Sequence, residues 1–228
     1  QQYTIIFWAE KNGAGHYETS DLRNVSINTS KKIYANDESR AAFFRVYEFE
    51  TENGEAVKET VELYRPFAQI NLGATNLETS FNNVNDGKVL IDSTKMVVTS
   101  LATSFNTLEG KGKGTQAVTF VGAPTPNGAV DNTEQKLEVN ELFYHWLGMN
   151  YVIVSGEDKD NVNVDISVFT NFGTVNHTVN SVPVKENYRT NLLGDFLTTG
   201  ATFNVVVDEK FQIPDYIVPV PGENGNGS

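Results

Sequence analysis

The sequence predicts an all-β protein built as a sandwich. Residues 162–168 place valine or isoleucine at every second position with polar residues between them, and residues 201–208 repeat the alternation. Such alternation is typical of a strand that turns one face to a core and the other to water. Stretches rich in glycine, proline or asparagine, such as 110–114 and 124–128, separate further short segments of this kind. Chains of this design more often serve recognition or assembly than catalysis.

The first 64 residues are expected to contain two strands and one short helix. Residues 3–10 are strand-like, and residues 55–64 form the second predicted strand. Between them, Asp37 stands in the N-cap position before residues 40–46, which favours a short helix. Pro66 then interrupts the pattern. Because proline cannot donate a ladder hydrogen bond, it marks a strand start, an edge or a crossing between domains.

Residues 67–73 resume clean alternation, so a domain boundary is predicted between residues 64 and 65. Two strands and a helix are too few for a sandwich. The segment 1–64 therefore either packs onto the later domain or is the C-terminal remainder of a first domain, and we favour the second interpretation. Since the chain starts at Gln1 without an initiator methionine, it is expected to be a mature or trimmed product.

Residues 65–211 are expected to form the second β-sandwich domain, and residues 212–228 a C-terminal extension. A short helix is predicted at 77–84, a hairpin turn at Asp86 and Gly87, and a helical turn or irregular connection at 187–196. Strands are predicted at residues 88–91, 95–105, 116–121, 136–142, 147–154, 162–170, 174–182 and 201–207.

Charge and composition exclude several classes of function. The formal net charge of −12 opposes binding to nucleic acid, whose affinity comes from lysine and arginine on phosphates, and opposes adhesion to anionic lipid. The absence of cysteine excludes disulfides, thiolate catalysis and cysteine-ligated zinc. No run approaches the roughly 20 apolar residues that a membrane helix needs.

The sequence predicts no catalytic, cofactor-binding or metal-binding residues, and no cofactor. Of the three histidines, His145 is expected to be packed in an apolar setting, and His16 and His177 to lie at the surface. A serine nucleophile would need the Gly-x-Ser-x-Gly elbow, which is absent. The acidic residues at 157–161 lack the spacing of a calcium loop and are expected to be a solvated loop. Residues 110–115 lack the Gly-Lys-Ser/Thr ending of a phosphate loop, which leaves a hairpin loop.

Large aromatic residues offer one alternative binding surface. Trp8, Tyr144, Trp146 and Tyr151 have flat faces that could stack on sugar rings, although aromatics at strand spacing are more often core residues. Tyr144 and Trp146 are therefore the candidate residues of a glycan-stacking platform.

Several segments together resemble the fimbrillin-like lipoproteins of Bacteroidales, in particular adhesin and type V pilus subunits of gut Bacteroides. The resemblance covers residues 1 to about 211, and its segments are FWAEKNGAGHYETSDLRNV, NDESRAAFFRV, RPFAQINLG, YHWLGMNYVIV and VPVKENYRTNLLGDFLTTGATFNVVVDEKF. It implies two tandem transthyretin-like β-sandwich domains, the first incomplete in this chain, with one or two short helices. It also implies export to the cell surface, the outer membrane or a fimbrium, with an upstream lipid anchor that this chain lacks.

Pilin members of that family join subunits by strand exchange, and the C-terminal extension at residues 212–228 is the segment that could be exchanged. Tyr216, Ile217, Val218 and Val220 are the tentative assembly strand. Two prolines at positions 219 and 221 remove amide donors along one edge, so such a strand pairs well on one side only. The tail is therefore an edge strand on its own domain, an edge strand on a neighbour, or a mobile segment.

The expected function is a non-enzymatic fimbrial subunit or adhesin that assembles or binds by β-strand complementation. Its expected partners are other fimbrial subunits, a self-polymer, or a host or bacterial surface protein or glycan. The alternative is a monomeric surface lipoprotein that binds glycan or protein ligands through loops and aromatics. A more distant alternative is a hydrolase with an unrecognised site.

Overall fold

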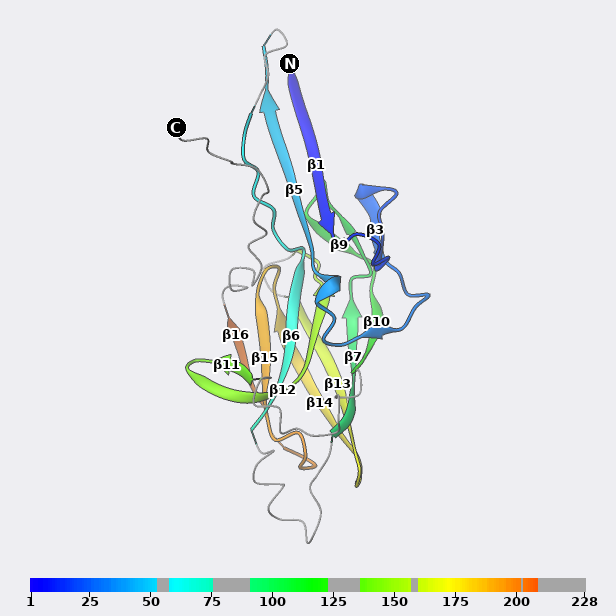
Figure 1. The fold of residues 1–228 in the computed structure, drawn as a ribbon, viewed down its shortest axis with the longest axis vertical. Helices are drawn as coiled ribbons and strands as arrows, with labels where there is room; N and C mark the ends of the chain where they lie inside the picture. Colours follow the sequence, from blue (N-terminus) through cyan, green and yellow to red (C-terminus); the bar gives the residue numbers. More distant parts are fainter. Residues whose placement is uncertain (53–57, 76–90, 123–135, 157–159, 202, 209–228) are drawn as a thin grey trace, which may run out of the picture.

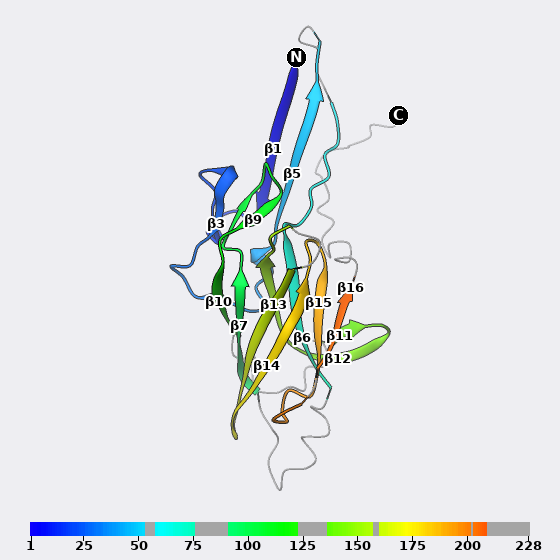
Figure 2. The ribbon, with the colours of Figure 1, turned by 180° about the vertical axis from the view of Figure 1, so that it is seen from behind.

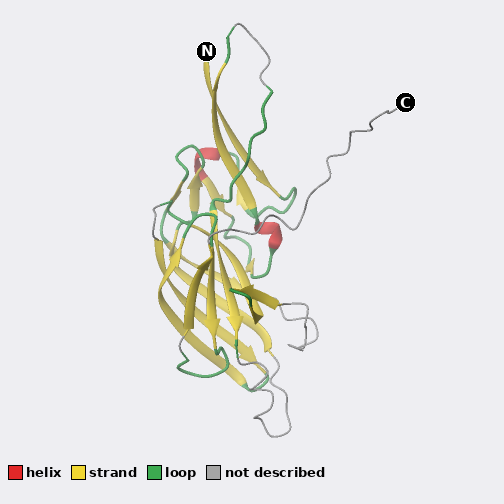
Figure 3. Cartoon of the chain, turned by 90° about the vertical axis from the view of Figure 1, so that its left-hand side faces the viewer, coloured by secondary structure: helices red, strands yellow, loops and turns green. Residues whose placement is uncertain are grey.

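The computed structural model describes residues 1–52, 58–75, 91–122, 136–156, 160–201 and 203–208 (Figures 1 and 2). The all-β prediction is confirmed, because this part of the chain contains strands β1 to β16 and no α-helix. Helical structure there is limited to two 3-10 turns, η1 (Leu22–Asn24) and η2 (Glu38–Arg40), drawn in red in Figure 3.

Two five-stranded sheets form the main body of the molecule (Figure 3). The first has the order β14-β13-β7-β10-β4, with β14 (Gly173–Val184), β13 (Asp160–Thr170), β7 (Ile91–Leu101), β10 (Gln116–Val121) and β4 (Ile33–Tyr34). The second has the order β11-β12-β6-β15-β16, with β11 (Lys136–Val139), β12 (Leu142–Ile153), β6 (Phe67–Ala74), β15 (Arg189–Gly194) and β16 (Phe203–Asp208).

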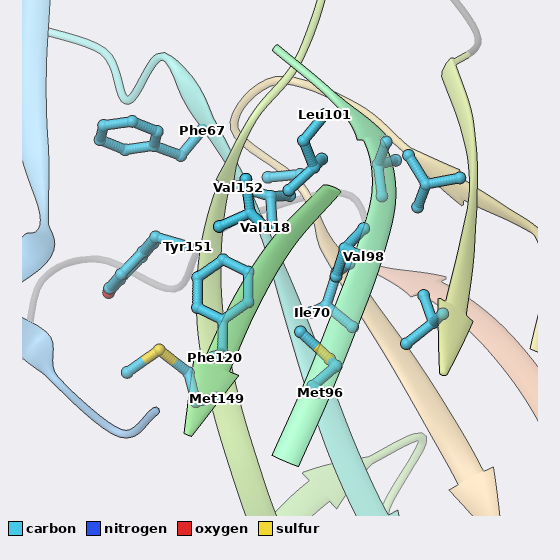
Figure 4. Packing of buried hydrophobic residues seen from close by; sticks show 14 of the residues in the cluster. Phe67, Ile70, Met96, Val98, Leu101, Val118, Phe120, Met149, Tyr151 and Val152 are labelled. Carbon is cyan, nitrogen blue, oxygen red and sulfur yellow. The ribbon is translucent and has the colours of Figure 1, made fainter. Parts of the chain in front are cut away.

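The core lies between these two sheets. Figure 4 shows Met96, Val98 and Phe120 from the first sheet beside Ile70 and Val152 from the second, and all five are at most 2% exposed. The inward positions follow the period-2 alternation of the sequence, as in β13, where every second residue from 162 to 168 is buried.

A smaller sheet and a two-stranded ribbon complete the fold. The sheet has the order β2-β3-β8-β9, with β2 (Tyr17–Glu18), β3 (Val25–Ile27), β8 (Ser104–Asn106) and β9 (Lys111–Lys113). The ribbon pairs β1 (Gln2–Glu10) with β5 (Ala42–Glu50) in antiparallel register, and it projects from one end of the sandwich (Figure 1).

The N-terminal segment is joined to the later strands by hydrogen bonds. β3 pairs with β8, and β4 runs parallel to β10 at the edge of the first sheet. These pairings join β3 and β4 to strands that come after residue 64, as the less favoured of the two interpretations expects. That the same segment also ends a preceding domain remains a prediction, as does the boundary at residues 64 and 65.

Three local predictions differ from the structure. Asp37 does cap a helical turn, since its carboxylate accepts the backbone amide of Ser39 at 3.1 Å, but the turn ends at Arg40 and residues 42–50 form β5. Pairing with β1 provides a complete ladder, which outweighs a helix of two turns. Residues 58–63 are irregular rather than a strand, and Tyr64 forms only an isolated bridge with Phe44.

The third difference is the largest. Residues 187–196, predicted to be a turn or irregular, contain the buried strand β15, which runs parallel to β6 and antiparallel to β16. β6 and β15 are buried along almost their whole length, so polar residues enter the interior with them. Asn71 donates from its amide to Asn191 Oδ1 at 2.8 Å, and both side chains are 1% exposed.

The other strand predictions that fall on described residues are confirmed within a few residues. The exceptions are boundaries: 95–105 is divided between β7 and β8, and β12 begins five residues before the predicted start. The predicted helix at 77–84, the turn at Asp86 and Gly87, residues 88–90 of the predicted strand 88–91, the predicted loop at 124–128 and the tail from residue 209 lie outside the described residues.

Candidate functional site

The outer edge of β1 carries backbone groups that no described strand pairs with. Gln1 and Thr51 exchange two backbone hydrogen bonds, of 2.7 and 3.1 Å, so they form a bonded pair of the ladder. Bonded and non-bonded pairs alternate along an antiparallel ladder. Residues 3, 5, 7 and 9 therefore bond to β5, whereas residues 2, 4, 6 and 8 direct their N–H and C=O groups away from it.

The opposite edge of the ribbon follows the same geometry. Phe44, the partner of Trp8 in a non-bonded pair, exchanges backbone hydrogen bonds of 2.8 and 2.9 Å with Tyr64. One position of the β5 edge is thus already paired. In the described part of the chain, the β1 edge has no such partner.

The two faces of the ribbon are both partly apolar. On one face the rings of Tyr3 and Tyr47 stack on Phe49, with centroids 5.3 and 5.9 Å apart, and Ile5 is 39% exposed. On the other face Ile6 pairs with Val46, and both are only partly buried. A two-stranded ribbon has no core of its own and is marginal in water. This ribbon therefore presents apolar surface that a further strand or sheet would cover.

The base of the ribbon is fixed to the sandwich by aromatic contacts. Trp8 meets Tyr17 edge-on at 5.7 Å, and Phe44 meets the fully buried Phe105 at 4.7 Å. Trp8 and Phe44 are partners in the ladder, so their rings lie on the same face of the ribbon and together hold its base against Tyr17 and Phe105.

The predicted site residues have different outcomes. Tyr216, Ile217, Val218 and Val220 lie outside the described residues. Tyr144 and Trp146 are half-buried on β12, where they pack against a small cluster formed by Leu137, Val139 and Leu193. The indole nitrogen of Trp146 donates to the carbonyl of Gly148 at 3.1 Å. The glycan platform at these two residues remains a prediction.

The surface expectation for His177 is wrong. His177 is 7% exposed, and its Nε2 lies 2.9 Å from the carbonyl oxygen of Phe196. The rings of Phe196 and Phe203 meet the imidazole edge-on, with centroids 5.8 and 5.0 Å away. A single carbonyl partner allows the ring to be buried as part of the core. The side chain of His145 lies outside the described set.

His16 is also not a simple surface residue. Its Nδ1 lies 3.2 Å from Nη1 of Arg40, and its Nε2 lies 2.7 Å from Ser39 Oγ. A guanidinium only donates, so Nδ1 accepts and the neutral ring carries its proton on Nε2. Burial lowers the pKa of His16, and the nearby charge of Arg40 lowers it further.

The remaining motifs have structural roles. The hairpin loop predicted at residues 110–115 is wrong for its central part, because Lys111–Lys113 form β9, which pairs with β8, and the turn between these strands lies at residues 107–110. The amide of Gly112 donates to the Ser155 carbonyl at 3.1 Å. Asp160 accepts the backbone amide and the hydroxyl of Ser155 at 2.5 and 2.6 Å, and its neighbours 157–159 lie outside the description.

Two kinds of feature are absent from the described residues. They contain no cluster of three or more histidine or acidic side chains suited to a metal ion. Among them, no helix has the length and apolar character needed to cross a membrane.

A family model described as "Family of unknown function (DUF6562)" matches residues 1–221. No curated protein matches the chain. Among solved structures, a Bacteroides thetaiotaomicron chain from a group described as "putative polysaccharide binding proteins" is similar with a TM-score of 0.50 and 12% identity, over 90% of this chain and 75% of that one. A "putative cell adhesion protein" of Bacteroides ovatus is similar with a TM-score of 0.47 and 12% identity, over 93% of this chain and 69% of that one. At 12% identity, the likeness to the Bacteroides thetaiotaomicron chain concerns the fold alone.

Proposed function

We propose, since this chain belongs to the family of unknown function DUF6562, that it is a non-enzymatic cell-surface subunit of the adhesin or fimbrial kind. It joins a neighbouring subunit by β-strand addition at the outer edge of β1. The observation that carries this proposal is the row of outward backbone groups at residues 2, 4, 6 and 8 on a projecting ribbon.

The energetics favour an added strand. Each backbone hydrogen bond made at the edge contributes about 1 kcal/mol net, because it replaces bonds to water. The incoming side chains would also cover the exposed surface of Tyr3 and Ile5. The outward groups of residues 2, 4, 6 and 8 can therefore contribute several kcal/mol in total, and the covered side chains help to offset the entropy cost of association.

The donor in this proposal is the tail of a second subunit, with Tyr216, Ile217, Val218 and Val220 as the assembly strand. Pro219 and Pro221 lack amide donors on one edge of that strand, which leaves the other edge for pairing. The β1 strand can pair on one side only, because its other side already pairs with β5. A one-sided donor and a one-sided acceptor are therefore complementary.

The same ribbon supports the domain organisation that we propose. Residues 1–64 end a first β-domain, residues 65–211 form the second, and residues 212–228 are the extension that reaches a neighbour. Apolar residues on both faces of the ribbon suit strands that belong to a larger sheet. Export and an upstream lipid anchor complete this proposal. The alternative of a monomeric glycan-binding lipoprotein stays a hypothesis.

Proline substitution at Thr4 tests the proposal. Thr4→Pro removes one outward amide and leaves the bonds to β5 intact, whereas Thr4→Ala keeps the amide and serves as the matched control. Light scattering during size-exclusion chromatography should show multimers for the parent chain and for Thr4→Ala. Thr4→Pro and the deletion of residues 212–228 should be monomeric with unchanged thermal unfolding. A parent chain that stays monomeric, or multimers that persist in Thr4→Pro, would refute strand addition at β1.

A further inference from the structure

A pocket of about 440 Å³ lies among the loops that follow β1 and precede β5, and no residue of β1 lines it. It is lined by the loop that contains Gly15 and His16, by Lys31 and Lys32 before β4, and by Tyr34 and Arg40. Its volume falls in the range of sites that hold small ligands.

The floor of the pocket contains a buried positive charge. Arg40 is 5% exposed, and its Nε has no hydrogen-bond partner. Its charge is not paired with any carboxylate in the described part of the chain, where its side-chain contacts are the His16 nitrogen at 3.2 Å and the ring of Tyr17 at 5.7 Å. A buried cation of this kind is costly unless an anion pairs with it.

The nearby acidic residues already have other partners. The carboxylate of Glu38, beside Arg40 in η2, accepts the hydroxyl of Tyr151 at 2.7 Å. Asp37 accepts from Ser39 and lies 3.4 Å from Nε2 of His16. Glu10 accepts the indole N–H of Trp8 at 3.1 Å. None of these carboxylates forms an ion pair with Arg40.

Two lysines add to the positive charge of the pocket. The ammonium of Lys31 lies over Gly15, 3.3 Å from where a side chain at that position would begin. Lys31 and Lys32 have no ion pair within the described residues. Lys31, Lys32 and Arg40 thus face a single lining carboxylate, Asp37, in a chain whose net charge is −12.

We propose that this pocket binds the carboxylate of an acidic saccharide, such as a uronic or sialic acid. The planar guanidinium of Arg40 supplies the fork of donors that a carboxylate accepts, and Lys31 adds a mobile charge at the opening. The ring of Tyr34, 48% exposed, offers a flat apolar face on which a sugar ring can lie. This site is independent of strand addition at β1.

Titration of the full chain with monosaccharides at low salt tests the proposal. D-glucuronic acid and N-acetylneuraminic acid should bind, with heat measured by calorimetry, and methyl glucoside should not. Lys31→Glu should raise the Kd for glucuronic acid at least about tenfold, which corresponds to about 1.4 kcal/mol of binding free energy. Lys185→Glu makes the same charge change at a residue that does not line the pocket, and it should leave binding within about twofold.

Further titrations distinguish binding of an acidic saccharide from binding of a simple anion. Tyr34→Ala should raise the Kd for glucuronic acid several-fold. Inorganic phosphate and acetate should bind the parent chain much more weakly than glucuronic acid does. Phosphate binding as tight as that of glucuronic acid would overturn the saccharide assignment. Absence of glucuronic acid binding, or equal weakening by Lys31→Glu and Lys185→Glu, would overturn the site itself. Because Lys31 is exposed, its variant tests the pocket without disturbing the core.

Discussion

Replacement of Leu192 by alanine is expected to destabilise the protein by about 3 to 4 kcal/mol. Leu192 is fully buried on β15, in register with Leu72 of β6 and Val205 of β16. The change removes three carbons, worth about 2.4 kcal/mol at roughly 0.8 kcal/mol each. The incompletely collapsed cavity adds about 1 kcal/mol at ~24 cal/mol per Å³ for a void of about 40 Å³.

Thermal unfolding measures this effect. In a chain of this size, 1 kcal/mol shifts Tm by about 2–4 °C, so the variant should melt roughly 6–16 °C below the parent chain. Leu142→Ala is the matched control, because Leu142 is 60% exposed and should lose less than about 1 kcal/mol. Equal melting temperatures for the two variants would show that residues 189–194 are not a buried central strand. That result would refute the topology of the second sheet.

Three other perturbations have definite expected results. Asn191→Ala should cost about 1–3 kcal/mol in urea unfolding, since it leaves the buried amide of Asn71 without its acceptor, and replacement of both by valine should recover most of the loss; a neutral single variant would contradict this. Gly112→Ala should lower Tm by more than about 5 °C, because the new Cβ would lie 2.1 Å from the carbonyl oxygen of Val154. Gly148→Ala should change Tm by less than about 2 °C, because its new Cβ would lie 3.5 Å from the nearest atom, Cδ1 of Leu72. Similar shifts for the two variants would show that the close backbone contact at Gly112 is not the cause. Burial raises the pKa of Glu186 from 4.5 to about 7, so the folded state keeps this proton to higher pH than the unfolded state, and the penalty is absent below pH 4.5 and complete above about pH 7. Because Glu186 is only partly buried, water screens most of this penalty and leaves about 1 kcal/mol. Glu186→Gln should therefore raise Tm by about 2–4 °C at pH 8 and change it much less at pH 4.5, and an equal gain at both pH values would count against burial as the cause.

The positions of most strands could be predicted from the sequence because alternation is a local property. β13 shows this best, since its buried positions follow the alternation of its own sequence from residue 162 to residue 168. β5 was mistaken for a helix because Asp37 gives a genuine capping signal, and the strand that follows depends on pairing with β1, more than 30 residues away in sequence.

The residues of the candidate sites were harder to predict from the sequence than the strands. Nothing local distinguishes Arg40 from a solvated arginine, because its burial arises from packing against Tyr17 and the His16 loop. The buried state of His177 likewise depends on Phe196 and Phe203. The edge of β1 left one signal, an apolar strand near the start of the chain, but which of its residues face outward follows only from the register with β5.

The sequence by itself determined that this chain is a β protein with an acidic, cysteine-free composition, since period and composition are read along a single strand. Only the tertiary structure decided that β15 lies between β6 and β16, that the first 64 residues add strands to the later sheets, and that three cations converge on one pocket. The physical reason is that pairing, burial and electrostatic environment are interactions between residues far apart in the chain. Their free energies depend on which segments meet, and the alternation of one segment does not specify its partner.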